Sequence, residues 1–320
     1  MPGTRMPVPP RVVAAPANAR PITDVVSELA RRLLTSEPPP TRMPTVRQLA
    51  SEHRSSLASI HIAIGRLEEA GAIVVERRGR LGAFLVARSV GRLWAATDGG
   101  PLVVSLPLAS SPRYEALATA IKQLLVRSGL EVFLIFVRGS RQRLQAVREG
   151  RCHLAVMSSF AASQLCEPDD EIVVELGPNS YNTGHRVFYP TPKAGEQPAR
   201  VIVDRHSADQ QLITALEFGG TDVQLIPAMT AQITRLLSNG QADAAVWTTD
   251  EMEATRLGGI HDRPLSPAVR ANVGDRDTRA ALVCQANAAG VLRAVTAFIE
   301  PAEFAQLQAD VMSGDVVPEY

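Results

Sequence analysis

The chain of 320 residues lacks the long hydrophobic segments that mark membrane and secreted proteins. It has no run of about eighteen apolar residues, which argues against a membrane-spanning helix. Residues 1–20 contain no apolar stretch of signal-peptide length. We therefore expect a cytoplasmic protein that does not associate with a membrane.

Metal and cofactor motifs are also missing. The three cysteines, Cys152, Cys166 and Cys284, are scattered and form no CxxC pair, so neither a zinc site nor a disulfide framework is predicted. No His-x-x-x-His spacing and no glycine-rich phosphate loop occurs. The acidic stretch 167–171, "EPDDE", is interpreted as a solvated turn rather than a metal site. We expect no metal and no cofactor.

Little in the sequence favours catalysis. Cys152 and His153 are neighbours on an expected strand, where adjacent side chains point to opposite faces and cannot act as nucleophile and base. Asp204 and His206 could form a dyad, but no nucleophile is evident nearby. We expect that the protein is not an enzyme. The alternative, an enzyme on a binding-protein-like fold with an autoregulatory DNA-binding arm, stays open.

Charge is distributed unevenly along a chain whose net charge is zero. Residues 1–92 carry 14 arginines and no lysine against seven acidic residues. The remainder carries 19 basic and 26 acidic residues. A basic end joined to an acidic body is the asymmetry expected when only the basic end meets phosphate.

The basic end has the pattern of a small DNA-binding domain. Residues 1–20 are rich in Pro, Ala and Arg without periodicity, and we predict a disordered tail. Helical patterns follow in "ITDVVSELARRLL", in "VRQLASEH" and in a longer segment that Ser56 caps and Gly71 ends. "AIVVERRGRLGAFLVA" is typical of two strands around a glycine turn. This order predicts a winged helix-turn-helix over 21–87, followed by a linker over 88–100.

The larger part, 101–320, alternates strand and helix patterns in two consecutive βαβαβ runs, which predicts α/β lobes with parallel sheets. The segments "REGRCHLAVMS" and "SNGQADAAVWT" have the same order of helix end, glycine and strand start. We interpret them as equivalent positions in two lobes that enclose a cleft.

Several motifs resemble a known family. "MPTVRQLA", "AIGRLEEAGAI" and "GRLGAFL" resemble the winged helix of GntR-type bacterial transcription regulators. "SLPLASSPRYEALATAIK" and "EGRCHLAVMSSFAA" resemble the YhfZ subgroup, which joins that winged helix to a periplasmic-binding-protein-like (type 2) domain. The resemblance implies a DNA-binding transcription regulator with an effector domain. The chain departs from the GntR pattern at Ser56-Leu57-Ala58-Ser59, where the family has Ser-Arg-x-Thr.

The departure moves the expected DNA contacts. Without that arginine, the helix lacks the fork that pairs with guanine, so reading is expected to shift to the arginines of the wing and to DNA shape. Leu57 is either an exposed apolar side chain or a contact to a thymine methyl group. A homodimer on an inverted repeat of duplex DNA is expected, because one winged helix buries little DNA surface. The expected DNA-binding residues are Thr45, Arg47, Ser56, Ser59, His61, Arg77, Arg78 and Arg80.

The cleft residues follow from a rule of open α/β folds, in which ligands lie beyond the carboxyl ends of parallel strands. Hydroxyls, guanidinium groups and helix N–H groups gathered there would favour a small anionic or zwitterionic effector, and its binding would modulate operator binding. The expected effector-binding residues are Ser110, Ser111, Arg113, Tyr114, Arg138, Ser158, Ser159, Asp204, His206, Ser207, Thr248 and Thr249.

Overall fold

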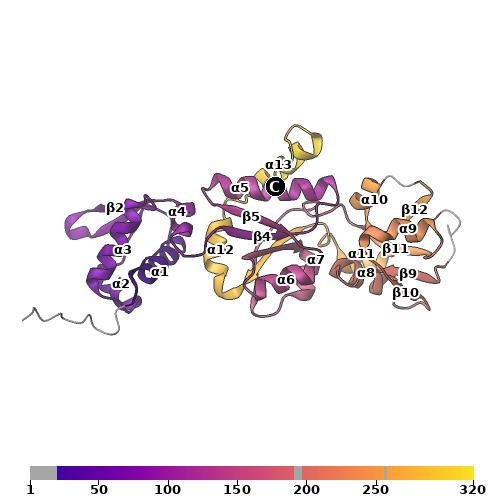
Figure 1. The fold of residues 1–320 in the computed structure, drawn as a ribbon, viewed down its shortest axis with the longest axis horizontal. Helices are drawn as coiled ribbons and strands as arrows, with labels where there is room; N and C mark the ends of the chain where they lie inside the picture. Colours follow the sequence, from indigo (N-terminus) through magenta and orange to yellow (C-terminus); the bar gives the residue numbers. More distant parts are fainter. Residues whose placement is uncertain (1–19, 191–196, 256–257) are drawn as a thin grey trace, which may run out of the picture.

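The computed structural model describes residues 20–190, 197–255 and 258–320. Apart from Arg20, the tail expected at 1–20 lies outside these ranges. Figure 1 shows three bodies in a row, with a small N-terminal domain at one end and two α/β lobes following it. Within the described ranges, no helix combines the length and the apolar character that a membrane crossing requires.

The N-terminal domain is the expected winged helix-turn-helix. Its three helices enclose a core in which Leu29, Ile60 and Leu67 are fully buried, and the wing closes over this core through Leu85. The strands form a three-stranded antiparallel sheet in the order β1-β3-β2. The elements are α1 (Ile22–Leu34), β1 (Thr41–Arg42), α2 (Val46–Glu52), α3 (Leu57–Glu69), β2 (Ile73–Arg77) and β3 (Ala83–Arg88).

The segment expected as a linker, 88–100, is itself folded. It holds α4 (Val90–Ala95), from which Leu93 enters the winged-helix core while Trp94 enters the core of the first lobe. Gly91 packs so closely on Gly129 that a Cβ atom there would lie 2.1 Å from the Gly129 carbonyl oxygen. Because α4 belongs to both cores, the winged helix is packed against the first lobe rather than loosely tethered to it.

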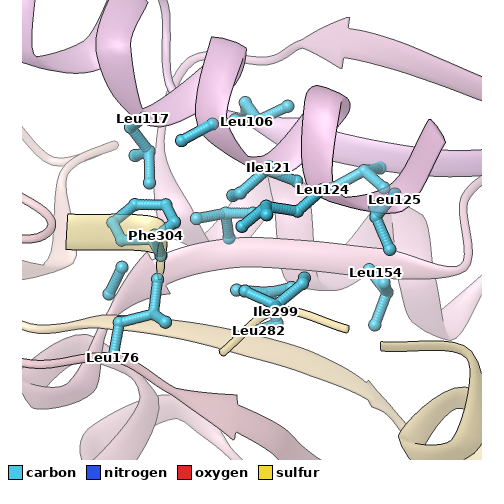
Figure 2. Packing of buried hydrophobic residues seen from close by; sticks show 14 of the residues in the cluster. Leu106, Leu117, Ile121, Leu124, Leu125, Leu154, Leu176, Leu282, Ile299 and Phe304 are labelled. Atoms are coloured by element: carbon cyan, nitrogen blue, oxygen red, sulfur yellow. The ribbon is translucent and has the colours of Figure 1, made fainter. Parts of the chain in front are cut away.

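The first lobe is built on a five-stranded sheet in the order β5-β4-β6-β13-β7. Figure 2 shows how leucines of α5 and Phe304 of α13 pack over this sheet on residues such as Leu106 and Leu282. The elements are β4 (Leu102–Leu106), α5 (Pro112–Arg127), β5 (Val132–Phe136), α6 (Ser140–Arg148), β6 (Leu154–Ser158), α7 (Ser159–Leu165), β7 (Asp170–Glu175), β13 (Ala280–Gln285), α12 (Ala289–Thr296) and α13 (Pro301–Ser313).

The second lobe repeats this plan with the sheet order β10-β9-β11-β8-β12. Its core residues, among them Val201, Ile213 and Val246, lie between the sheet and its helices. The elements are β8 (His185–Pro190), β9 (Arg200–Val203), α8 (Ala208–Phe218), β10 (Gln224–Pro227), α9 (Ile233–Ser238), β11 (Ala244–Thr248), α10 (Thr249–Thr255), β12 (Ile260–Pro264) and α11 (Pro267–Val273).

The two-lobed α/β architecture is confirmed, but the expectation of parallel sheets is wrong, because both sheets are mixed. In each lobe three strands run parallel, and one strand from a chain crossing lies antiparallel beside them. That strand is β8 in the second lobe and β13 in the first. The chain passes between the lobes twice, so each lobe receives a strand that enters from the other one. The βαβ pattern did not anticipate β7, β8 or β12.

The acidic stretch 167–171 is not a solvated turn throughout. Asp170 begins β7, and its buried carboxylate lies 2.5 Å from Nη2 of Arg148. Burial alone would raise the pKa of Asp170, but the hydrogen bonds and charge of Arg148 outweigh burial and lower it. This carboxylate therefore fastens the edge of the first sheet to α6.

Candidate functional site

The hydroxyl groups expected to contact DNA are used to begin helices. Thr45 and Gln48 form a capping box at the start of α2, in which the Gln48 N–H donates to Thr45 Oγ1 over 3.3 Å. Ser56 caps α3 by accepting from the Ser59 N–H at 3.0 Å, and the two serine hydroxyls lie 2.8 Å apart. These side chains fix the entry of both helices, whereas Arg47 and His61 are exposed and lie beside them.

The three arginines of the wing differ in how freely they could reach DNA. Arg77 donates to Glu68 of α3 at 2.9 Å, and Arg78 donates to Glu76 at 2.7 Å while lying over the Phe84 ring. Arg80 stands in the exposed turn Gly79–Leu81 and forms no ion pair within the described ranges. The tip of the wing thus presents the guanidinium group that is least restrained by its own domain.

The outward face of α3 holds residues that were not among the expected contacts. Ile62 and Arg66 are exposed on it, and Arg54 is exposed in the turn before the helix. On this helix the sequence drew attention only to Ser56–Ser59 and to His61. The helical period from Leu57 through His61 to Gly65 could have indicated the remainder of the face.

The second candidate site is a cavity of about 530 Å³ between the lobes, which is within the usual size of small-molecule sites. The first lobe contributes residues after β4 and β5, and the second lobe contributes residues after β9 and β10 and at the end of β11. The lining residues are Pro107, Leu108, Ser110, Tyr114, Arg138, Gly139, Ser140, Arg143, Tyr181, Asp204, Ser207, Asp209, Met229, Ala231, Thr234, Trp247 and Glu251.

The structure brings part of the expected effector site together. Five of the expected residues line the cavity, namely Ser110, Tyr114, Arg138, Asp204 and Ser207. Thr248 lines a small adjoining cavity. The remainder line neither cavity: Ser111, Arg113, Ser158, Ser159, His206 and Thr249.

Of these six residues, Ser111, Ser158 and His206 have partners within the protein. Ser111 and Ser158 cap α5 and α7, and Ser158 also donates to Asp209 at 2.5 Å. His206 Nδ1 lies 2.5 Å from Nε2 of Gln142 in the other lobe. The sequence placed these residues correctly at the ends of strands. The next helix begins at the same point, so the serine hydroxyls there are used to cap it.

The two arginines expected to bind an anion form ion pairs between the lobes. Arg138 forms an ion pair with the buried Asp204, and Arg113 donates from Nε to Asp250 Oδ1 at 2.8 Å. In both pairs the arginine belongs to the first lobe and the carboxylate to the second. The guanidinium charges that the sequence assigned to a ligand are thereby balanced within the protein.

Arg143, which the sequence did not single out, is the buried cation of the cavity. Its guanidinium donates to the carbonyls of Val156 and Val137, each at 2.8 Å, and to Tyr181 Oη at 3.0 Å. A guanidinium group has five N–H donors, so two have no partner within the described ranges. All three partners are uncharged in their ordinary state. Arg143 thus places a positive charge on the wall of the cavity and forms no ion pair within the described ranges.

Two carboxyl groups also line the cavity. Glu251 of α10 accepts from Ser110 at 2.7 Å and from Trp247 and Thr248 at 2.9 Å each, and none of these donors is charged. Asp209 is buried at the start of α8. Burial raises the pKa of Asp209, and the charge of His185 and the Ser158 hydroxyl only partly oppose this. With Arg143 and Glu251 on its wall, the cavity carries groups of both signs.

A buried ion pair joins the two chain crossings next to this cavity. His185 Nδ1 lies 2.8 Å from Oδ2 of Asp277, and the backbone N–H of His185 donates to the same oxygen at 3.1 Å. Burial alone would lower the pKa of His185, but the hydrogen bond and charge of Asp277 outweigh burial and raise it. The pair ties the start of β8 to the return crossing before β13.

The neighbouring pair Cys152–His153 has a structural environment. Burial raises the pKa of the Cys152 thiol to about 11, which disfavours the nucleophilic thiolate. His153 Nδ1 accepts the N–H of Val103 at 2.9 Å, and its ring packs edge-on against Trp94. Both side chains support the packing of the first sheet.

Family models agree with this division of the chain. A helix-turn-helix domain model matches residues 41–85, and the YhfZ C-terminal domain model matches residues 90–320. The chain is 31% identical over 300 residues to the uncharacterised protein YhfZ of Escherichia coli K12, with 92% of this chain and 96% of that protein aligned.

Two solved structures are similar to parts of the chain. The crystal structure of YhfZ from Shigella flexneri aligns with a TM-score of 0.60 and 27% identity, over 72% of this chain and 98% of that one. The periplasmic aliphatic sulphonate binding protein SsuA of Escherichia coli aligns with a TM-score of 0.49 and 18% identity, over 68% of this chain and 75% of that one. By the extent of the YhfZ matches, the chain belongs to the YhfZ family, with a helix-turn-helix domain followed by the YhfZ C-terminal domain, which has two α/β lobes.

Proposed function

We propose that this protein is a GntR-like transcription regulator whose cleft binds a small zwitterionic or anionic metabolite and thereby changes its binding to an operator. The observation that carries the proposal is the joining of a helix-turn-helix domain to a cavity of about 530 Å³ with charges of both signs. We also propose that the protein is cytoplasmic, because a transcription regulator has to reach the DNA of the cell.

The distribution of charge in the cavity favours a zwitterion over a simple anion. A carboxylate of the ligand would accept from the unused N–H groups of Arg143, and an ammonium group would donate to Glu251 or Asp209. Apolar parts of the ligand would lie against Leu108, Met229 and the ring of Trp247. A purely anionic ligand would approach those carboxylates without a compensating charge.

Coupling to DNA would pass through rigid packing. A ligand that contacts both lobes stabilises the closed arrangement, and it shifts the equilibrium only by its differential affinity for that arrangement. The winged helix follows the first lobe because α4 belongs to both cores. We propose a homodimer, in which lobe closure changes the distance between two winged helices on an inverted repeat.

The proposal is tested by thermal shift with a panel of amino acids and of carboxylic acids that lack the ammonium group. We expect stabilisation by members of the first set, because a ligand of the native state raises its melting temperature. Glu251→Gln should remove the preference for the ammonium group. The stabilising compound should then change the retention of genomic fragments in filter binding. If no DNA fragment is retained at low ionic strength, the proposal that the protein is a transcription regulator is contradicted.

We further propose that the cleft binds its ligand without chemical change. The high pKa of the Cys152 thiol and its place in the sheet core support this. Mass spectrometry of the stabilising compound after incubation with the protein checks the proposal. Conversion of the compound would favour the alternative of an enzyme with a DNA-binding arm.

A further inference from the structure

The face of α3 that points away from the winged helix is largely apolar. Leu57 is 48% exposed and Ile62 is 50% exposed, with Ala58 exposed between them. Gly65 leaves open space, since nothing lies within 4 Å of a Cβ atom built there. At helical spacing these positions share one face with His61. A surface helix normally turns its charged residues outward. An apolar outward face is therefore more typical of a surface that binds a partner than of one that faces water.

The surroundings of this face are mainly positive, with Glu69 as an exposed acidic residue at the C-terminal end of α3. Exposed arginines without an ion pair in the described part of the chain lie before it, along it and on the neighbouring elements. They are Arg42, Arg47, Arg54, Arg66 and Arg80. The occupant of the face therefore has apolar groups at its centre and negative charge on its flanks.

The major groove of duplex DNA has that arrangement. Phosphates line its two edges, and the apolar group on its floor is the 5-methyl group of thymine. The hydroxyls of Ser56 and Ser59 are hydrogen-bonded within the helix cap, so they compete poorly for base edges. Ile62 follows Leu57 by five residues along the helix, which places the two side chains over different base pairs of the groove.

We propose that α3 reads its operator through thymine methyl groups, with Leu57 and Ile62 as the specificity-determining residues and the surrounding arginines as phosphate contacts. The inference rests on the proposed DNA-binding function. It predicts half-sites with thymine at the positions beneath these two side chains, on either strand.

The test begins with selection of binding sites by the full-length protein from a pool of random duplexes. Each thymine of the selected site is then replaced by deoxyuridine, which keeps the base pair and removes only the methyl group. We expect about a fourfold loss of affinity for each contacted methyl, equivalent to about 0.8 kcal/mol. In Leu57→Ala and in Ile62→Ala, one thymine position should lose its methyl contact. At that position the affinities for the thymine duplex and the deoxyuridine duplex should then have a ratio of about 1. Arg80→Ala is the matched control, which should weaken both versions equally.

The outcomes separate this inference from the function on which it rests. Tight binding with no loss at any deoxyuridine overturns thymine reading and leaves DNA binding intact. Failure to retain any duplex overturns both. If Leu57→Ala and Ile62→Ala change the oligomeric state and leave the ratio unaltered, the face is a contact between copies of the chain, and the inference fails. Because both side chains are half exposed, the alanine variants should fold normally.

Discussion

The Nε atom of Arg113 lies 2.8 Å from Oδ1 of Asp250, so a cation from the first helix of one lobe meets a carboxylate from the other lobe. The same carboxylate accepts from the N–H and hydroxyl of Thr183 at 2.6 and 2.9 Å. Both side chains of the pair are largely buried, which limits screening by solvent. The lobes are therefore held together by a contact that lies outside the wall of the cavity.

Loss of this contact should open the lobes. In Asp250→Asn the charge partner of Arg113 is gone, and a hydrogen bond to a charged group is worth about 1.5–3 kcal/mol. We expect the radius of gyration measured by small-angle X-ray scattering to increase, and trypsin to cut the crossing segments faster. Glu303→Gln, which breaks the exposed pair between Arg127 and Glu303 inside the first lobe, is the control and should change neither. An unchanged radius for Asp250→Asn would contradict the role of the pair.

Arg80 should contribute more to DNA affinity than Arg78. Arg80→Ala removes a guanidinium group that has no ion pair among the described residues, whereas Arg78 already pairs with Glu76. For each winged helix we expect Arg80→Ala to reduce the slope of log affinity against log salt by about 1. Arg78→Ala should change it less, because the charge of Arg78 is already balanced by Glu76. Fluorescence anisotropy on a labelled duplex measures both slopes, and equal effects of the two substitutions would contradict this ranking.

Local patterns predicted the individual elements of this fold better than their assembly. Alternating helix and strand patterns with capping residues such as Ser56 are local, and they located the winged helix and the central parallel strands of both lobes. The antiparallel strands β8 and β13 are placed by the path of the chain between the lobes. Nothing in the sequence of β8 itself, His185–Pro190, indicates which strand it joins. Mixed sheets were missed for that reason.

The cavity was anticipated at the carboxyl ends of the strands, but its charge balance was not. In the sequence, Arg113 and Arg138 had no evident carboxylate partner nearby. Their partners are distant along the chain: Asp250 is 137 residues from Arg113, and Asp204 is 66 residues from Arg138. Arg143 was passed over because it lies one turn inside a helix whose start was taken as the binding element. Pairing at long sequence distance decides which charge is left for a ligand, and a single sequence does not contain that information.

Gly91 should be essential to the junction between the winged helix and the first lobe. Gly91→Ala would force its Cβ atom against the carbonyl of Gly129, and the overpacking should destabilise the protein by about 1–3 kcal/mol. Gly290→Ala on α12 is the matched control at the same junction, because its Cβ atom would meet only Thr35 Cγ2 at 3.7 Å. We expect a lower melting temperature for the first variant and an unchanged or higher one for the second. Equal melting temperatures would show that α4 can move without cost.

Stability should depend on pH through His185. Its pKa is raised above the ordinary value of about 6.5 by Asp277, so protonation is favoured in the folded state. A group of this kind stabilises fully below the unfolded pKa, and the contribution is lost as the pH rises through the folded pKa.

We therefore expect the melting temperature to fall as the pH is raised above about 6.5 in a series of low-salt buffers. His185→Asn keeps a polar side chain at the start of β8 but cannot take up the proton. The melting temperature of this variant should therefore not show the fall above about pH 6.5 that His185 causes. His261→Asn, at an exposed position on β12, is the control and should retain the wild-type dependence. Identical pH profiles for wild type and His185→Asn would show that the Asp277 contact holds the crossings together without the charge on histidine.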